Sequence, residues 1–248
     1  MKMYKLLAIL GIVAFLMPSM TVKATTLGTV DISGSVRGAN GVADVYGGGY
    51  AGQSVFTGAY LLNKTSGTSA GTLWDNGSVS GFCIELDESA PHSAYTYEVV
   101  GVSDAYSGLL NESVGIEKSN YLSELWGRYY DPSWTDGSYD LPDNSSAAAF
   151  AAAVWEIVYE DLPASSYGWD VTEDSAPGIS GFAIDGINSS TANAWLASLD
   201  GTGPMTDLAV FTNDGNQNYL VAVPEPTTML LLGVGGVLGA MRRKKRLA

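Results

Sequence analysis

The only cysteine of the chain, Cys83, is the side chain best suited to covalent chemistry. It lies in residues 79–86, where side chains alternate between two faces as in a strand, with Phe82, Ile84 and Leu86 on the apolar face and Cys83 on the other. A thiolate that attacks a carboxamide carbon releases ammonia and leaves a thioester. A single cysteine excludes an intramolecular disulfide framework and a cysteine-cluster metal site. The alternative role of Cys83 is a small, partly buried strand residue.

Other residues that bear chemistry form weaker patterns. Acidic residues are so numerous that pairs suited to glycoside hydrolysis can be chosen freely, which favours none of them. His92 is the only histidine, and no Gly-x-Ser-x-Gly motif accompanies it, so a solvated loop residue is the favoured interpretation. Residues 136–144 concentrate carboxylates as calcium sites do, without the spacing of an EF-hand loop. We therefore expect no cofactor, with calcium as the alternative to a solvated turn.

Glu156 stands between Trp155 and Ile157, a carboxylate beside an aromatic ring as in carbohydrate-binding or hydrolytic sites. A helix packed against a sheet explains the same residues. Residues 147–158 are rich in alanine, with N-cap candidates at 143–146 and Pro163 shortly after, which predicts a helix. Its apolar stripe of Phe150, Val154, Ile157 and Val158 is predicted to face the core.

The elements around these residues predict a β-rich α+β fold. Residues 25–100 are rich in Gly, Ser, Thr, Tyr and Val, with turn signals between short alternating runs, and we expect strands at 54–62, 79–86 and 95–100. Helical spacing follows at 120–130, with a short helix at 191–196 and a last strand at 219–223. We therefore predict one module over residues 25–222, an antiparallel β-sandwich or barrel with a helical insertion.

The charge of this middle region excludes whole classes of partner. Between residues 25 and 223 there are 25 acidic residues and four basic ones, a formal charge of −21. Such a surface repels nucleic acid and anionic lipid. Nearly all Trp and Tyr residues lie here too, which indicates a folded core rather than disorder.

The first 24 residues have the pattern of a secretory signal. Lys2 and Lys5 precede an apolar run at 6–17, and a polar stretch ends at Ala24. The run is shorter than the roughly 20 residues that span a bilayer, which favours a cleaved signal helix (1–24) over a membrane anchor.

Residues 223–248 contain three ordered parts. Pro224, Glu225 and Pro226 are followed by an apolar run at 229–241 and then by the basic residues Arg242, Arg243, Lys244, Lys245 and Arg246. The 15 residues 227–241 would form a helix of about 22 Å against a hydrocarbon core of about 30 Å, so it is short for a permanent transmembrane anchor. Basic residues after it stay on the cytoplasmic side, which places the preceding domain outside.

This tail resembles the PEP-CTERM sorting signal. The resemblance implies that an exosortase-type membrane protease cuts near the motif and releases the protein from an inner-membrane intermediate to the cell surface, outer membrane or extracellular matrix. An ordinary tail anchor is the alternative.

The middle region resembles the bacterial thioester domains of surface adhesins. The resemblance is carried by residues 81–86 around Cys83 and by residues 148–157. In that family a cysteine and a glutamine near the start of a helix condense to an internal thioester. Here Cys83 occupies the cysteine position and Ala151 the glutamine position, and alanine has no acyl group. Gln53 and Gln217 lie in different sequence contexts. The resemblance thus supports the fold and argues against the reaction.

The sequence leads to three functional hypotheses. The first is an exported, non-catalytic surface or matrix protein that contacts exopolysaccharide, with the sorting protease and the membrane as further partners and no role in nucleic-acid binding. The second is a covalent thioester-type adhesin, and the third is a secreted polysaccharide-active enzyme.

Overall fold

The computed structural model describes residues 24–225, except 48, 92, 108–111 and 174–180. The expected signal helix, the apolar run after Glu225 and the basic residues 242–246 lie outside these ranges. Within the described ranges, no helix has both the length and the apolar character needed to cross a membrane.

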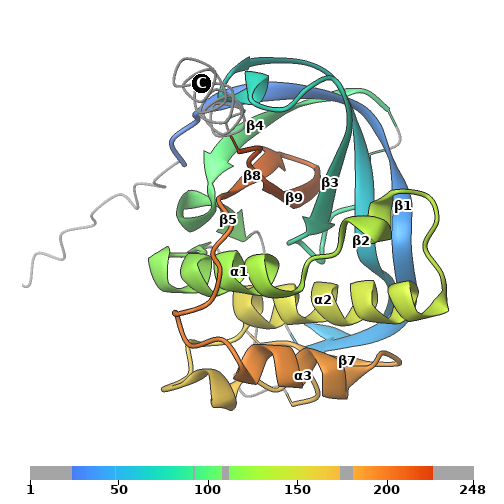
Figure 1. The fold of residues 1–248 in the computed structure, drawn as a ribbon, viewed down its shortest axis with the longest axis vertical. Coiled ribbons are helices and arrows are strands. Elements are labelled where there is room, and N and C mark those ends of the chain that lie inside the picture. Colours follow the sequence, from blue (N-terminus) through green and yellow to red (C-terminus); the bar gives the residue numbers. More distant parts are fainter. Residues whose placement is uncertain (1–23, 48, 92, 108–111, 174–180, 226–248) are drawn as a thin grey trace, which may run out of the picture.

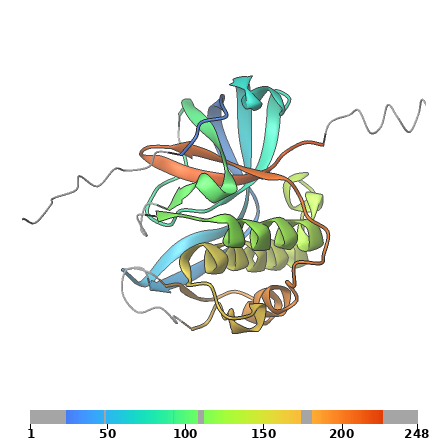
Figure 2. The same cartoon turned by 90° about the vertical axis from the view of Figure 1, so that its left-hand side faces the viewer.

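The centre of the fold is an antiparallel sheet whose strands close into a ring. Each of six strands pairs with two neighbours in the order β1-β2-β3-β9-β8-β4 and back to β1. This closure favours the barrel over two packed sheets (Figures 1 and 2). The strands are β1 (Gly28–Gly47), β2 (Tyr50–Ser69), β3 (Gly77–Cys83), β4 (Tyr95–Gly101), β8 (Leu208–Asn213) and β9 (Asn216–Ala222).

The hairpin of β1 and β2 is much longer than the ring. Only the first five residues of β1 pair with β4, whereas β1 and β2 pair along their whole length with several register shifts. The rest of the hairpin bends over to pack on helix α2 and pairs near its tip with the short strand β7 (Ala183–Asp185). Gly58 permits the close approach, because a Cβ there would stand 2.4 Å from the Ala39 carbonyl oxygen.

The helices form an insertion between two strands that are neighbours in the ring, β4 and β8. They are α1 (Ile116–Tyr129), α2 (Leu141–Tyr159) and α3 (Ser189–Ala197). A small two-stranded sheet, β5 (Tyr106–Ser107) and β6 (Glu112–Ser113), precedes them. Figure 2 shows the helices as a layer below the ring, and the long hairpin of β1 and β2 packs on α2. The predicted helical insertion is therefore confirmed.

Helix α2 begins earlier than predicted, because its N-cap is Asp140 and not one of the candidates at 143–146. The Asp140 carboxylate accepts a hydrogen bond from the Asp143 amide, and the Asp143 carboxylate accepts one from the Asp140 amide. From Ala147 to Tyr159 every residue is buried, because the helix is enclosed by the hairpin and by the other helices. The prediction that only one stripe of this helix, including Phe150 and Val154, faces the core is thus too narrow, because all sides of the helix are buried over these residues.

The predicted alternation puts Phe82 and Cys83 on opposite faces of the strand. Both faces are buried, since the exposed fraction of Cys83 is 2% and that of Phe82 is 0%, so the interpretation of Cys83 as partly buried understates its burial. Phe82 packs against the aromatic rings of the helical layer, whereas Cys83 faces the interior beside β9. Strand β3 is therefore covered on both sides, which a period of two cannot reveal.

Candidate functional site

Two places in the fold carry candidate chemistry: the surroundings of Cys83, and the end of strand β9, where the Pro-Glu-Pro motif begins. The first is buried. The second is exposed.

The thiol of Cys83 donates a hydrogen bond to the main-chain oxygen of Glu85, with 2.6 Å between sulfur and oxygen. Burial raises the pKa of this thiol strongly, and the nearby Glu85 carboxylate raises it further, against smaller opposite effects from that hydrogen bond and from the Trp155 indole. At neutral pH the group is therefore a protonated thiol, a weak nucleophile.

Ala151 is buried one helical turn before Trp155, on the same face of α2. The methyl group of Ala151 offers no acyl carbon.

A glutamine that the sequence comparison set aside lies near Cys83. Tyr219 pairs with Cys83 across the β3–β9 ladder, so Gln217, two residues away, lies diagonally opposite on the same face. The amide nitrogen of Gln217 is 3.5 Å from the Glu85 main-chain oxygen that also accepts the Cys83 thiol. The side-chain oxygen of Gln217 is buried without a hydrogen-bond partner among the described residues. Only the strand pairing reveals this approach of thiol and carboxamide.

Glu156 is buried inside the domain. It has an exposed fraction of 1%, and its carboxylate accepts a hydrogen bond from the main-chain amide of Asp170 at 2.9 Å. The core interpretation of residues 155–157 therefore accounts for it. His92 lies outside the described residues.

The carboxylates of residues 136–144 have separate partners. Asp136 accepts both the amide and the hydroxyl of Ser138, at 2.7 and 2.6 Å, and Asp140 caps α2. The side-chain oxygen of Asn144 accepts the amide of Asn40 at 2.8 Å. Across the described ranges, no three His, Cys, Asp or Glu side chains converge as a metal site.

All four basic residues of the middle region are engaged within the molecule. Lys64 donates to Asn76, Lys118 to the Val158 carbonyl, and Arg128 to Glu124 and Asp200. The guanidinium of Arg37 lies over the Phe56 ring, 3.0 Å from its centre. The charge of this region is therefore predominantly acidic, because these four cations stand against 25 carboxylates.

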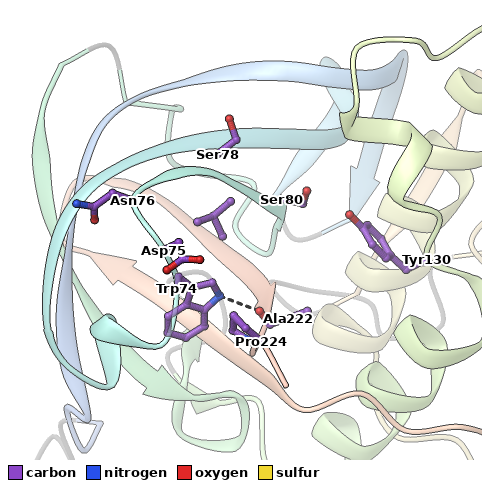
Figure 3. Close-up of a pocket in the computed structure, with 9 residues that line it drawn as sticks. Trp74, Asp75, Asn76, Ser78, Ser80, Tyr130, Ala222 and Pro224 are labelled. Carbon is purple, nitrogen blue, oxygen red and sulfur yellow. Dashed lines mark hydrogen bonds between the residues drawn. The ribbon is translucent and has the colours of Figure 1, made fainter. Parts of the chain in front are cut away.

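The sorting motif follows directly from strand β9. Pro224 and Glu225 are exposed, and Val223 just before them is half-buried. Pro226 and the basic residues 242–246 lie outside the described residues. Beside Pro224 is a hollow of about 310 Å³, shown in Figure 3.

Comparison with known proteins finds a match at the end of the chain. Residues 222–246 match the profile of the PEP-CTERM protein-sorting motif. No curated protein and no solved structure shows significant similarity to the chain. The matched motif marks an exported protein that an exosortase sorts, whereas the thioester resemblance rests on the two sequence blocks alone.

Proposed function

We propose that this chain is a non-enzymatic protein of the cell surface or extracellular matrix, placed there by exosortase-type processing. The observation that carries the proposal is the match of residues 222–246 to the sorting motif. The geometry supports it, because Pro224 and Glu225 are exposed where a protease can reach them.

We propose further that the acidic surface of the domain contacts a polysaccharide. The cations of the domain are engaged internally, and several aromatic side chains are exposed, including Tyr167 with an exposed fraction of 82%. Aromatic rings and carboxylates together suit contact with a neutral polysaccharide, with divalent cations as bridging counter-ions. Such a partner avoids the repulsion that an anionic one would meet.

The test of sorting replaces Pro224, Glu225 and Pro226 with alanine in the full chain. The matched control is Glu112→Ala, another exposed acidic residue in the described region. The expected result is a precursor that accumulates in the inner membrane and is lost from the surface, measured by fractionation and surface labelling. Surface display equal to that of the control would overturn the proposal.

A covalent thioester adhesin is the second candidate, and the proximity of Gln217 to Cys83 favours it. In the reaction Sγ would bond to the side-chain carbonyl carbon of Gln217, the bond from that carbon to nitrogen would break, and the thiol proton would leave with the nitrogen as ammonia. The strongly raised pKa of the thiol opposes this step, since the thiolate is the nucleophile.

Intact mass distinguishes the two candidates. A thioester lowers the mass of the mature domain by about 17 Da, and methylamine then adds to it. Gln217→Ala and Ala151→Gln are the informative variants: the first abolishes a deficit that depends on Gln217, and the second tests the position that the family uses. A full-mass wild-type domain with an alkylatable Cys83 after unfolding excludes the thioester.

A further inference from the structure

Strand β9 is fixed up to the residue before the sorting motif. The Ala222 carbonyl accepts a hydrogen bond from the Trp74 indole nitrogen at 2.8 Å, and the Val223 amide donates to the Asp207 carbonyl at 2.8 Å. Pro224 has no N–H and cannot continue the ladder. The folded sheet therefore ends where the motif begins, with no spacer between them.

Trp74 is itself held in place. Its exposed fraction is 4%, and its ring packs edge to face against Phe211 of β8 at 5.0 Å between ring centres. Because the ring cannot turn without losing this packing, the position of the Ala222 carbonyl is fixed relative to β8. The direction in which the motif leaves the domain is fixed with it.

The hollow beside Pro224 is formed by three separate parts of the chain. Figure 3 shows Trp74 and the start of β3 on one side, the exit of β9 below, and Tyr130 at the end of α1 across from them. Hydroxyl, amide and carboxylate groups line much of it, from Asp75, Asn76, Ser78 and Ser80, and its described lining contains no basic side chain.

The length of the chain after the hollow limits where this edge of the domain lies. Only five residues, 224–228, separate Val223 from the apolar run that begins at Met229. Fully extended they span at most about 17 Å. If the apolar run is in the membrane, the hollow lies within that distance of it, and a protease that cuts in this interval meets the edge of the domain.

We infer that this edge, residues 74–80 with Tyr130, is a docking surface for the sorting protease, and that Trp74 is a positioning residue for the sorting reaction. The inference rests on the proposed sorting function. The hydrogen-bonding groups of the hollow suit a polypeptide loop rather than acyl chains, and Asp75 with the acidic domain repels anionic lipid. The motif and the edge of the domain are thus two linked elements of this chain that bind the same protease.

The first test moves the Pro-Glu-Pro sequence away from the edge of the domain by inserting a flexible spacer. An insertion of eight Gly and Ser residues between Val223 and Pro224 leaves the Pro-Glu-Pro sequence, the apolar run and the basic end unchanged. Processing of the full precursor in vesicles that contain the protease is expected to fall about tenfold at low precursor density and to recover at saturation, because docking contributes to binding. Unchanged or faster processing would overturn the inference, and faster processing would show that the folded domain obstructs the protease.

Trp74→Phe removes the indole N–H and keeps an aromatic ring against Phe211. We expect processing at low density to fall about threefold to fivefold, the effect of one hydrogen bond, at a temperature well below the thermal unfolding midpoint of the variant. The matched control is Trp169→Phe, since Trp169 is equally buried and its indole nitrogen has no partner among the described residues. Equal processing of the two variants contradicts the positioning role.

Ser78→Trp fills the hollow from an exposed position and tests the surface directly. Processing is expected to fall as with the spacer, while the fold is retained. The triple alanine replacement of Pro224, Glu225 and Pro226 distinguishes the sorting function of the motif from the docking role of the edge. If that replacement stops sorting while the spacer, Trp74→Phe and Ser78→Trp variants are processed normally, the sorting function stands and the docking surface is rejected.

Discussion

Three surface turns share one local sequence pattern but differ in how they join the rest of the molecule. Asp136, Asp170 and Asp200 each accept the amide and the hydroxyl of the Ser or Thr two residues later. The turns at 170 and 200 are also bound by a buried glutamate of the helical layer. No such bond is found for the turn at 136 within the described residues.

The buried glutamates make the difference. Glu124 of α1, with an exposed fraction of 1%, accepts the amides of Gly201 and Gly203 at 2.7 and 2.9 Å and pairs with Arg128. Glu156 of α2 accepts the amide of Asp170. The three turns therefore have the same local hydrogen bonds, but only two of them are bonded to a buried glutamate among the described residues. We expect mutations to lower the free energy of unfolding more at the turns that have this bond.

Glu124→Ala is expected to have the largest effect. It leaves two loop amides and the Arg128 guanidinium without their common acceptor, and we expect the free energy of unfolding to fall by about 3 kcal/mol, measured by urea denaturation. Glu117→Ala on the exposed side of the same helix is the control. A loss equal to that of the control would show that the turn at 200 needs no anchor.

Gly203→Ala tests the same attachment from the loop side. A Cβ at this position would stand 2.2 Å from Nε of Arg128 and 2.6 Å from a Glu124 carboxylate oxygen. We expect a loss of about 1–3 kcal/mol in the free energy of unfolding, because the loop must move away. In the Glu124→Ala background the same change should cost less, and additive losses would contradict the shared mechanism.

The pH dependence of Asp170 gives a smaller effect. Burial by itself would raise its pKa, but hydrogen bonds from Thr172 and Asn193 hold that pKa below the ordinary value of 3.8. The resulting stabilisation is present above pH 3.8 and is lost as the pH falls through the lower folded-state pKa. Because the group is largely solvated, we expect a contribution below about 1 kcal/mol. The stability difference between wild type and Asp170→Asn should therefore shrink below pH 3.8, and a constant difference would contradict this.

Asp136→Ala is expected to have the smallest effect. The hydrogen bonds from Ser138 hold the pKa of this exposed carboxylate below its ordinary value, yet they join only adjacent residues. The thermal unfolding midpoint should stay within experimental error of that of the wild type. A shift as large as that of Glu124→Ala would remove the distinction between anchored and unanchored turns.

Much of the fold was accessible from the sequence. Helix α2 was predicted from its alanine content and the nearby Pro163, and strand β4 almost to the residue, because local propensity and pattern are strong there. Strand β1 was not predicted as a separate strand, and β2 is longer than the predicted 54–62, since glycines and register shifts interrupt the alternation that marks a strand. The boundaries of α1 and α3 also differ from the predicted ones by a few residues.

The candidate sites divide in the same way. The sorting motif is a local sequence and was recognised as one. The environment of Cys83 depends on which strands pair: β9 brings Gln217 beside it from 134 positions later in the chain, and α2 brings Trp155. The separation of the two residues along the sequence therefore could not predict that Gln217 lies near Cys83.

The sequence by itself determined the sorting signal, the acidity of the domain and the types of most elements, because these depend on composition and on neighbours along the chain. Only the tertiary structure decided that Cys83 is buried, that Glu124 anchors a remote turn and that Trp74 holds the strand that leads into the motif. Each of these depends on contacts between distant segments, and such contacts leave no local pattern.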